Sequence, residues 1–312
     1  MNNQLKIGTR ESQLAVWQAT LVKDLLQQQG VESELIFIKS EGDIDLKTPL
    51  YEMGVQGIFT KTLDAALLNN RIDIAVHSMK DVPTQLASGI MQAAVLKRGN
   101  YKDILVYKNK EWRMENGELP SINSSLSIAT SSIRRKAQWL HKYPQHQIHN
   151  LRGNVNTRLQ KLQTENWDAA IFAAAGLERI NLRPENSIEL DWMLPAAAQG
   201  AIMVVCREDD NDVKEKCLLL NDEATALCTK IERDFLRTLL GGCSTPISAL
   251  AEIEEDELFF RGNILSLDGK QKQEIEKILP VDMATNIGKE AAIELLQNGG
   301  QEIADSIRNA SK

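Results

Sequence analysis

The chain has 312 residues, of which 43% are hydrophobic and 25% charged, a composition typical of globular proteins and unlike that of disordered chains. No apolar run reaches the roughly 18–20 residues that a membrane-spanning helix requires, and a formal net charge of −7 argues against a general binder of nucleic acid or of anionic membranes. A chain of this length exceeds one ordinary hydrophobic core, so we expect two or three domains.

The first part of the chain alternates between strands and helices. Its first residues, MNNQLK, have neither a basic segment nor a long apolar one, so we expect no secretory signal and a cytoplasmic protein. The expected elements are a strand at Gln4–Ile7, a helix of about 18 residues ending at Gly30, a strand at Glu34–Lys39, a helix at about Thr60–Asn69 and a strand at Ile72–Val76. Between them, Gly42–Gly57 has no sustained period, which favours a mobile loop over a site.

The same alternation returns after Arg98–Asp103, where we expect the chain to cross into a second unit. The predicted elements there are a strand at Leu126–Ala129, a helix at Ser132–His141, a strand at about Gln147–Asn150, a helix at Val155–Thr164 and a strand at Ala169–Ala173. A further strand at Ala201–Cys206 is expected to cross back to the first sheet. The remaining elements are an amphipathic helix from Asp222 to Leu240 that stops at Gly241-Gly242, strands at Leu258–Leu267 and Lys272–Leu279, and a helix at about Met283–Asn298.

These elements predict an α/β fold with a smaller α+β unit at its C-terminal end. We expect a discontinuous first domain of residues 1–99 with 200–218, a second domain of residues 104–194 with a basic cleft, and a third domain of residues 222–312. A cleft between two α/β units suits a small charged ligand. The sequence has no Walker loop and no GxGxxG motif, so nothing in it supports a nucleotide cofactor.

Positive charge is concentrated in one segment. There is no acidic residue between Glu118 and Glu165, and the same stretch carries Arg134, Arg135, Lys136, Lys142, Arg152, Arg158 and Lys161. Arg10 and Ser12 lie at an earlier strand–helix junction of similar kind. An acidic protein that gathers cations in this way is expected to form an anion site there; a solvated basic face is the alternative.

Two motifs follow predicted strands directly. In the first, Thr130, Ser131 and Ser132 open a helix that carries Arg134 and Arg135, and free N–H groups, hydroxyls and guanidinium groups suit carboxylate or phosphate oxygens. The alternative is an ordinary serine N-cap with exposed arginines.

In the second motif, His77-Ser78-Met79-Lys80-Asp81-Val82-Pro83, Ser78 and Lys80 can hold an oxyanion. Asp81 is the carboxylate of the group and could exchange protons or stabilise a cation. The alternative is a turn with a Lys–Asp surface pair. His77 is more often a packed residue at a strand end than a catalyst.

The cysteines show no CxxC pair, which argues against a zinc site. Cys206, Cys217 and Cys228 are expected to be buried or idle thiols, because an even cysteine count says little in a reducing compartment. Cys243 lies just past a predicted helix C-terminus, where the helix dipole does not lower a thiol pKa. Its Gly-Gly-Cys-Ser-Thr-Pro setting suits a covalent anchor, and a structural thiol is the alternative.

Together these segments resemble the hydroxymethylbilane synthase (porphobilinogen deaminase) family over most of the chain. The stretches that carry the resemblance are Arg10–Gln18 (RESQLAVWQ), Asp73–Pro83 (DIAVHSMKDVP), Thr130–Arg135 (TSSIRR), Leu151–Leu159 (LRGNVNTRL), Ala174–Arg179 (AAGLER), Leu194–Ala201 (LPAAAQGA) and Glu232–Ile247 (ERDFLRTLLGGCSTPI). Each is modest alone, but their joint occurrence in this order is specific.

The resemblance implies two domains like type II periplasmic binding proteins, a third domain that bears the cofactor, and a dipyrromethane cofactor in thioether linkage to Cys243. Four porphobilinogen units add head to tail with loss of ammonia, and water releases hydroxymethylbilane, a step in tetrapyrrole and heme biosynthesis. Asp81 is implied as the catalytic carboxylate, which handles pyrrole N–H groups and a cationic intermediate. The implied partners are porphobilinogen alone, with no nucleic acid and no membrane, and the protein is expected to be a monomer.

The resemblance also implies a binding role for many residues. Those assigned to the cofactor are Ser78, Lys80, Thr130, Ser131, Ser132, Arg134, Arg135, Arg158, Gln199 and Gly200, beside Cys243 itself. Those assigned to substrate or the growing chain are Arg10, Ser12, Gln18, Phe59, Arg152 and Arg179.

The sequence departs from the family pattern in three places. Gln56 replaces a cofactor-contacting lysine, Lys47 replaces an aspartate in the same loop, and Ala198 replaces a glycine before Gln-Gly. None of these changes touches Asp81 or Cys243, so we expect activity to survive. The alternative function is a non-catalytic carboxylate-binding protein on the same fold, which would need no covalent tether.

Overall fold

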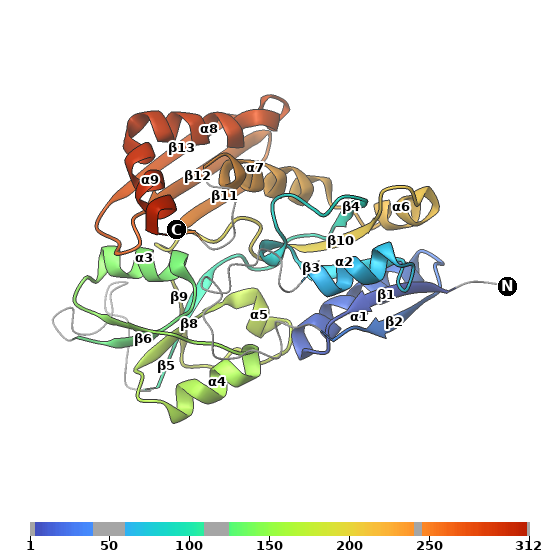
Figure 1. Cartoon of the computed structure of the whole chain (residues 1–312), viewed down its shortest axis with the longest axis horizontal. Helices are drawn as coiled ribbons and strands as arrows, with labels where there is room; N and C mark the ends of the chain where they lie inside the picture. The colour runs from blue at the N-terminus through green and yellow to red at the C-terminus, as the bar shows by residue number, and fades with distance from the viewer. Residues whose placement is uncertain (1–3, 40–59, 109–124, 240–244, 311–312) are drawn as a thin grey trace.

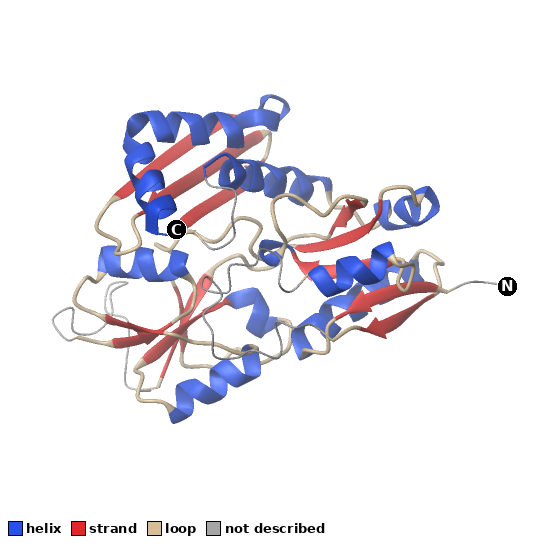
Figure 2. Ribbon diagram, in the orientation of Figure 1, coloured by secondary structure: helices blue, strands red, loops and turns tan. Residues whose placement is uncertain are grey.

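The structure is a computed structural model that describes residues 4–39, 60–108, 125–239 and 245–310. These residues form three sheets, each with its own helices (Figures 1 and 2). Cys243, Phe59, Gln56 and Lys47 lie outside the described residues.

The first sheet has the strand order β2-β1-β3-β10-β4. Its strands are β1 (Leu5–Thr9), β2 (Ser33–Phe37), β3 (Ile74–Ser78), β4 (Ile90–Val95) and β10 (Ile202–Arg207). The first three are parallel, whereas β10 runs antiparallel to both of its neighbours. Because successive strand residues face opposite sides, Ile74 and Val76 pack with α1 (Gln13–Gln28) and α6 (Asn211–Leu218), and Ala75 packs with α2 (Lys61–Leu68).

The second sheet also has five strands, in the order β7-β6-β8-β5-β9. Its strands are β5 (Asp103–Tyr107), β6 (Ser127–Ala129), β7 (Gln147–His149), β8 (Ala169–Ala173) and β9 (Ser187–Glu189). Here α3 (Ile133–Lys142) covers one face with Trp139, while α4 (Val155–Thr164) and α5 (Ala174–Glu178) cover the other. Two crossover segments, 96–102 and 190–201, join the two sheets.

The third sheet is an antiparallel meander of β11 (Ile247–Glu254), β12 (Glu257–Leu265) and β13 (Lys272–Pro280). Its helices are α7 (Glu223–Leu239), α8 (Ile287–Leu295) and α9 (Gln301–Ala310), all packed into one apolar core with the strands (Figure 1). A 3₁₀ helix, Val281–Asn286, precedes α8.

The predicted α/β alternation and the antiparallel C-terminal unit are confirmed. The strand predicted at Ala201–Cys206 does cross back, because it pairs with β3 and β4 as β10. The final helix predicted at about Met283–Asn298 corresponds to α8, which is shorter. A further helix was not expected: the chain turns at Gly299, whose φ of +102° a glycine adopts without steric cost, and α9 follows. Strand β11 was not predicted, since its alanines and glutamates are poor strand formers.

One buried carboxylate connects the crossover segments with the third sheet. Glu232 of α7 is 0% exposed and accepts hydrogen bonds from Arg98 (2.6 and 3.2 Å), from the backbone N–H of Ala198 (2.6 Å) and from that of Ala251 (2.8 Å). Ala198 has a φ of +61°, a left-handed conformation that glycine adopts more easily, so the glycine that the resemblance implies at this position would fit this backbone with less strain. Glu232 therefore ties both crossover segments to the third unit.

Candidate active site

The candidate site lies where strands of both α/β sheets end. The 3₁₀ helix Met79–Asp81 follows β3, and Thr130-Ser131-Ser132 follows β6 and opens α3. Asp81 is exposed and close enough to Lys80 and Arg158 to influence the pKa of both. The structure thus brings together residues that are widely separated in the sequence.

Lys80 lies among other charged groups. Its Nζ donates a hydrogen bond to Oε1 of Gln199 (3.3 Å). Burial lowers its pKa to about 8; Arg135 and Arg134 act in the same direction, while Asp81 and Asp103 oppose the shift. The ammonium is therefore charged at neutral pH but close to losing its proton.

Asp103, at the start of β5, is a central residue of the site that the sequence analysis missed. It is 0% exposed, and its Oδ1 accepts hydrogen bonds from Nε of Arg135 (3.0 Å) and from Nε2 of Gln199 (2.9 Å). Its Oδ2 lies 2.7 Å from a terminal nitrogen of Arg134. Burial alone would raise the pKa of this carboxyl, but Arg134 and Arg135, with help from Gln199 and Lys80, hold the pKa at about 2.

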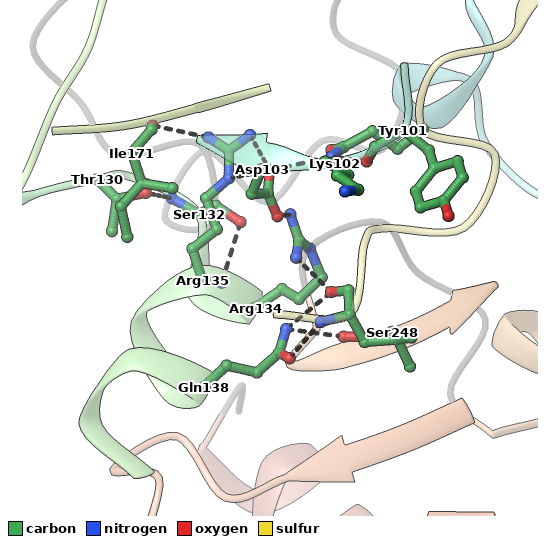
Figure 3. A network of polar contacts seen from close by, with 12 residues as sticks. Tyr101, Lys102, Asp103, Thr130, Ser132, Arg134, Arg135, Gln138, Ile171 and Ser248 are labelled. Carbon is green, nitrogen blue, oxygen red and sulfur yellow. Dashed lines mark hydrogen bonds and ion pairs between the residues drawn. The ribbon is translucent and has the colours of Figure 1, made fainter. Parts of the chain in front are cut away.

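Arg134 and Arg135 both point from α3 toward Asp103 (Figure 3). All three nitrogens of Arg135 have partners within the protein, since one terminal nitrogen donates to the carbonyl of Ile171 (3.0 Å) and the other lies 2.8 Å from Asp103. Arg134 donates to the carbonyl of Leu194 (2.7 Å), but its buried Nε has no hydrogen-bond partner among the described residues. The pair is 4% and 6% exposed, so the alternative of exposed arginines is wrong.

The hydroxyl groups of the same motif have local partners. Ser132 caps α3 by accepting from the N–H of Arg135 (3.4 Å), so the serine N-cap of the alternative interpretation is present, although its exposed arginines are not. Thr130 accepts from the N–H of Ser132 (3.2 Å). Ser131 accepts from the N–H of Leu151 (2.8 Å) and donates to its carbonyl (2.6 Å). These contacts hold the start of α3 against the Leu151 segment, and any ligand role of the hydroxyls remains a prediction.

The first sheet contributes a second polar group. Gln18 of α1, 2% exposed, donates from Nε2 to Oγ of Ser78 (2.9 Å), and Ser12 caps α1. Burial, with Arg10 in second place, lowers the pKa of His77 to about 4, so this histidine is neutral at physiological pH. The interpretation of His77 as a packed strand-end residue fits this burial.

The remaining predicted arginines surround these groups. Nε of Arg158 donates to the carbonyl of Gly153 (2.7 Å), and burial followed by the charge of Arg135 lowers its pKa to about 10. Arg179 donates to the carbonyl of Gly200 (2.6 Å) and lies over the ring of Trp17. Arg152 is 4% exposed.

This arrangement can bind a polyanion and hold one exposed carboxylate beside it. Lys80 and Arg158 approach Asp81 from two different segments, and Arg134 lies near Lys80. The Nε of Arg134, which has no partner among the described residues, is a donor suited to an additional acceptor such as a carboxylate. Within the described residues, no cluster of His, Cys, Asp and Glu could hold a metal ion.

Comparison with protein families gives two matches. Residues 5–215 match the family "Porphobilinogen deaminase, dipyromethane cofactor binding domain", and residues 226–297 match "Porphobilinogen deaminase, C-terminal domain". A porphobilinogen deaminase of Chlorobium phaeobacteroides is 39% identical over 99% of both chains. One of Geotalea uraniireducens is 40% identical over 96% of this chain and 93% of its own.

The solved structures that the comparison finds are much more distant in sequence. The methionine binding protein MetQ has 15% identity and a TM-score of 0.44 over 70% of this chain and 89% of its own. The periplasmic VFT2 domain of Bordetella pertussis BvgS has 13% identity and a TM-score of 0.41 over 69% of this chain and 86% of its own. In the part of the chain that the structure describes, none of the helices combines the length and the apolar character that crossing a membrane would demand.

Proposed function

Because the chain belongs to the porphobilinogen deaminase family, we infer that it is a transferase that joins four porphobilinogen molecules head to tail, with loss of ammonia, into hydroxymethylbilane. The observation that carries this conclusion is the family match over residues 5–215 and 226–297. A non-catalytic carboxylate-binding protein is not favoured, because the matched N-terminal domain is one that binds a dipyrromethane cofactor.

We propose Cys243 as the attachment point of the cofactor. When bound, the dipyrromethane supplies the terminal pyrrole to which the first porphobilinogen is joined. Lys80 and Arg134 are the groups best placed to hold its carboxylates, because Lys80 carries a charge at neutral pH and Arg134 has an N–H without a partner among the described residues. Ser78 and Arg158 lie on the neighbouring segments, and each charge-assisted hydrogen bond contributes roughly 1.5–3 kcal/mol.

We propose that Asp81 is the catalytic carboxylate. The bound cofactor or growing chain would supply a pyrrole α-carbon that replaces ammonia on the aminomethyl carbon of porphobilinogen, and the proton of that α-carbon would leave with the ammonia. Positive charge develops on the incoming pyrrole as its C–N bond breaks, and an ionised carboxylate beside it stabilises that charge. Asp81 is exposed, next to Lys80, and can also accept a hydrogen bond from a pyrrole N–H.

The arginines are proposed to neutralise the product as it grows. Every added unit brings an acetate and a propionate, so negative charge accumulates in the site. Arg158 and Arg179 keep pKa values of about 10 and therefore stay protonated throughout the physiological range. The proposed substrate-binding residues also include Arg10, Ser12, Gln18, Phe59 and Arg152.

We further propose the domain division 1–99 with 200–218, 104–194 and 222–312, which the composition of the three sheets supports.

We propose that the protein is a cytoplasmic monomer that binds no nucleic acid. In the described part of the chain, Cys206, Cys217 and Cys228 are buried, unpaired thiols, which suits a reducing compartment. The net charge of −7 does not favour nucleic acid as a partner.

The function is tested by incubating the purified protein with porphobilinogen and measuring both ammonia and hydroxymethylbilane. We expect four molecules of ammonia for each hydroxymethylbilane released in steady state. A protein that binds porphobilinogen but releases no ammonia would instead be the carboxylate-binding alternative.

Cofactor attachment should depend on pH through Lys80. Because burial lowers the pKa of Lys80 to about 8, the ammonium is charged below this pH and neutral above it. In cofactor-free protein given porphobilinogen, we expect the attachment rate to fall as the pH rises through about 8. Lys80→Arg should remove this fall, because a guanidinium remains protonated. Attachment is followed by intact-protein mass at a series of pH values, with Lys142→Arg as the control; equal profiles for the two variants would contradict the assignment.

A further inference from the structure

Gln138 makes an unusually complete set of contacts for a residue that the proposed chemistry does not use. It lies on α3 one turn after Arg134 and is 4% exposed. Its Oε1 accepts from the N–H of Leu194 (2.9 Å), and its Nε2 donates to the carbonyl of Leu194 (2.9 Å) and to Oγ of Ser248 (3.0 Å). Figure 3 shows Gln138 and Ser248 facing each other directly below the Arg134–Asp103 pair.

These contacts join three parts of the molecule. The carbonyl of Leu194 also accepts from Arg134 (2.7 Å), so Arg134 and Gln138 hold the same peptide group of the second crossover segment. The next residue, Pro195, accepts from the N–H of Ala249 in β11 (3.3 Å). The crossover segment is therefore held between α3 on one side and the start of β11 on the other.

The start of β11 is important because Cys243 lies shortly before it in the sequence. Ser248 is 0% exposed and follows Cys243 by five positions in the sequence. Five residues span at most about 17–18 Å when fully extended. The place at which β11 begins therefore limits where a group carried by Cys243 can reach.

We propose that Gln138 is a positioning residue that fixes the start of β11, the strand that follows Cys243 in the sequence, relative to Arg134 and Asp103 of the second unit. In this role Gln138 acts through Ser248 and Leu194 rather than by direct contact with substrate or cofactor. The inference rests on the proposed function in one respect, the attachment of the cofactor to Cys243. Its physical basis is that a misplacement of about 1 Å in a reacting group can cost roughly a hundredfold in rate.

A purely structural role of Gln138 can be separated from a positioning role, because α3 makes a second contact with the third unit. Nδ1 of His141, almost one turn further along the helix, lies 2.8 Å from the carbonyl of Gly269 in the turn between β12 and β13. This contact joins the same two units but lies away from the start of β11. His141→Ala is therefore the matched control for Gln138→Leu.

The experiment compares Gln138→Leu, Ser248→Ala and His141→Ala in the full-length protein. For each, intact-protein mass gives the cofactor load, steady-state kinetics give kcat and KM, and thermal unfolding gives Tm. We expect all three to carry cofactor. Gln138→Leu should lower kcat about ten- to a hundredfold with little change in KM, Ser248→Ala should lower it a few-fold, and His141→Ala should leave it within about twofold.

A second readout follows elongation itself. With limiting porphobilinogen, intact-protein mass shows how many units each protein molecule has added. Gln138→Leu and Ser248→Ala should accumulate with few added units. His141→Ala should not, when the variants are compared at equal stability. A loss of kcat that follows Tm equally in all three variants would overturn the proposal. If Gln138→Leu does not fold, Ser248→Ala against His141→Ala decides, and equal kcat values would overturn it. An unmodified wild-type protein would instead contradict the anchor at Cys243.

Discussion

Replacing Asp81 with alanine should lower kcat by about 10²–10⁴-fold, while the protein still carries its cofactor. The reason is that Asp81 is an exposed carboxylate beside Lys80, at the place where we propose that porphobilinogen develops positive charge on losing ammonia. Binding should change much less, because the cations that hold the carboxylates of substrate and cofactor remain. The measurement is steady-state turnover together with intact-protein mass, which shows how many units each molecule has added.

Asp212→Ala provides the control for this prediction, because Asp212 is an exposed carboxylate on α6, in the first unit but remote from the site. Its turnover should equal that of the wild-type protein. If Asp81→Ala turned over at a near-normal rate, another carboxylate would have to carry the chemistry.

Replacing Asp103 with alanine should lower the free energy of unfolding by about 3–5 kcal/mol, the usual cost of leaving buried charges without their partner. Asp103 is 0% exposed and balances Arg134 and Arg135, which are almost as deeply buried. Urea denaturation at pH 7 measures the loss. Glu189→Ala is the control, because Glu189 pairs with Lys102 at partly exposed positions and should cost under about 1 kcal/mol.

The pH dependence of stability provides a further check on Asp103. Its folded-state pKa of about 2 lies below the ordinary aspartate pKa of 3.8, so its ion pairs stabilise the folded protein fully above pH 4. That contribution is lost as the pH falls toward 2. The stability difference between wild type and Asp103→Asn should therefore shrink below pH 4; a difference that stayed constant to pH 2 would contradict the low pKa.

Periodicity and helix caps predicted the elements around the site well. Helix Val155–Thr164 and strand Ala169–Ala173 have the predicted bounds. Asn154 caps the former by accepting from the N–H of Thr157 (3.0 Å), a local signal that is readable in the sequence. Three arginines of the basic segment, Arg134, Arg135 and Arg152, are buried, and the anion site predicted there stays a prediction.

The identity of the internal anion could not be predicted in the same way. Asp103 lies outside the acid-free segment and reaches Arg134 and Arg135 only because β5 lies beside β8 in the folded sheet. No pattern of neighbouring residues in the sequence predicts this contact between distant segments. Gln138 did leave a signal, because a polar residue on the buried side of an amphipathic helix requires partners, but the sequence does not show that Leu194 and Ser248 supply them.

The central claim is that this protein builds its product on a cofactor tethered to Cys243, and intact-protein mass spectrometry tests it most directly. Protein from a host that makes porphobilinogen should carry the mass of one dipyrromethane. The adduct should be absent from Cys243→Ser and present in Cys228→Ser, whose cysteine is buried in α7. An unmodified wild-type chain, or an adduct that survives in Cys243→Ser, would contradict the account.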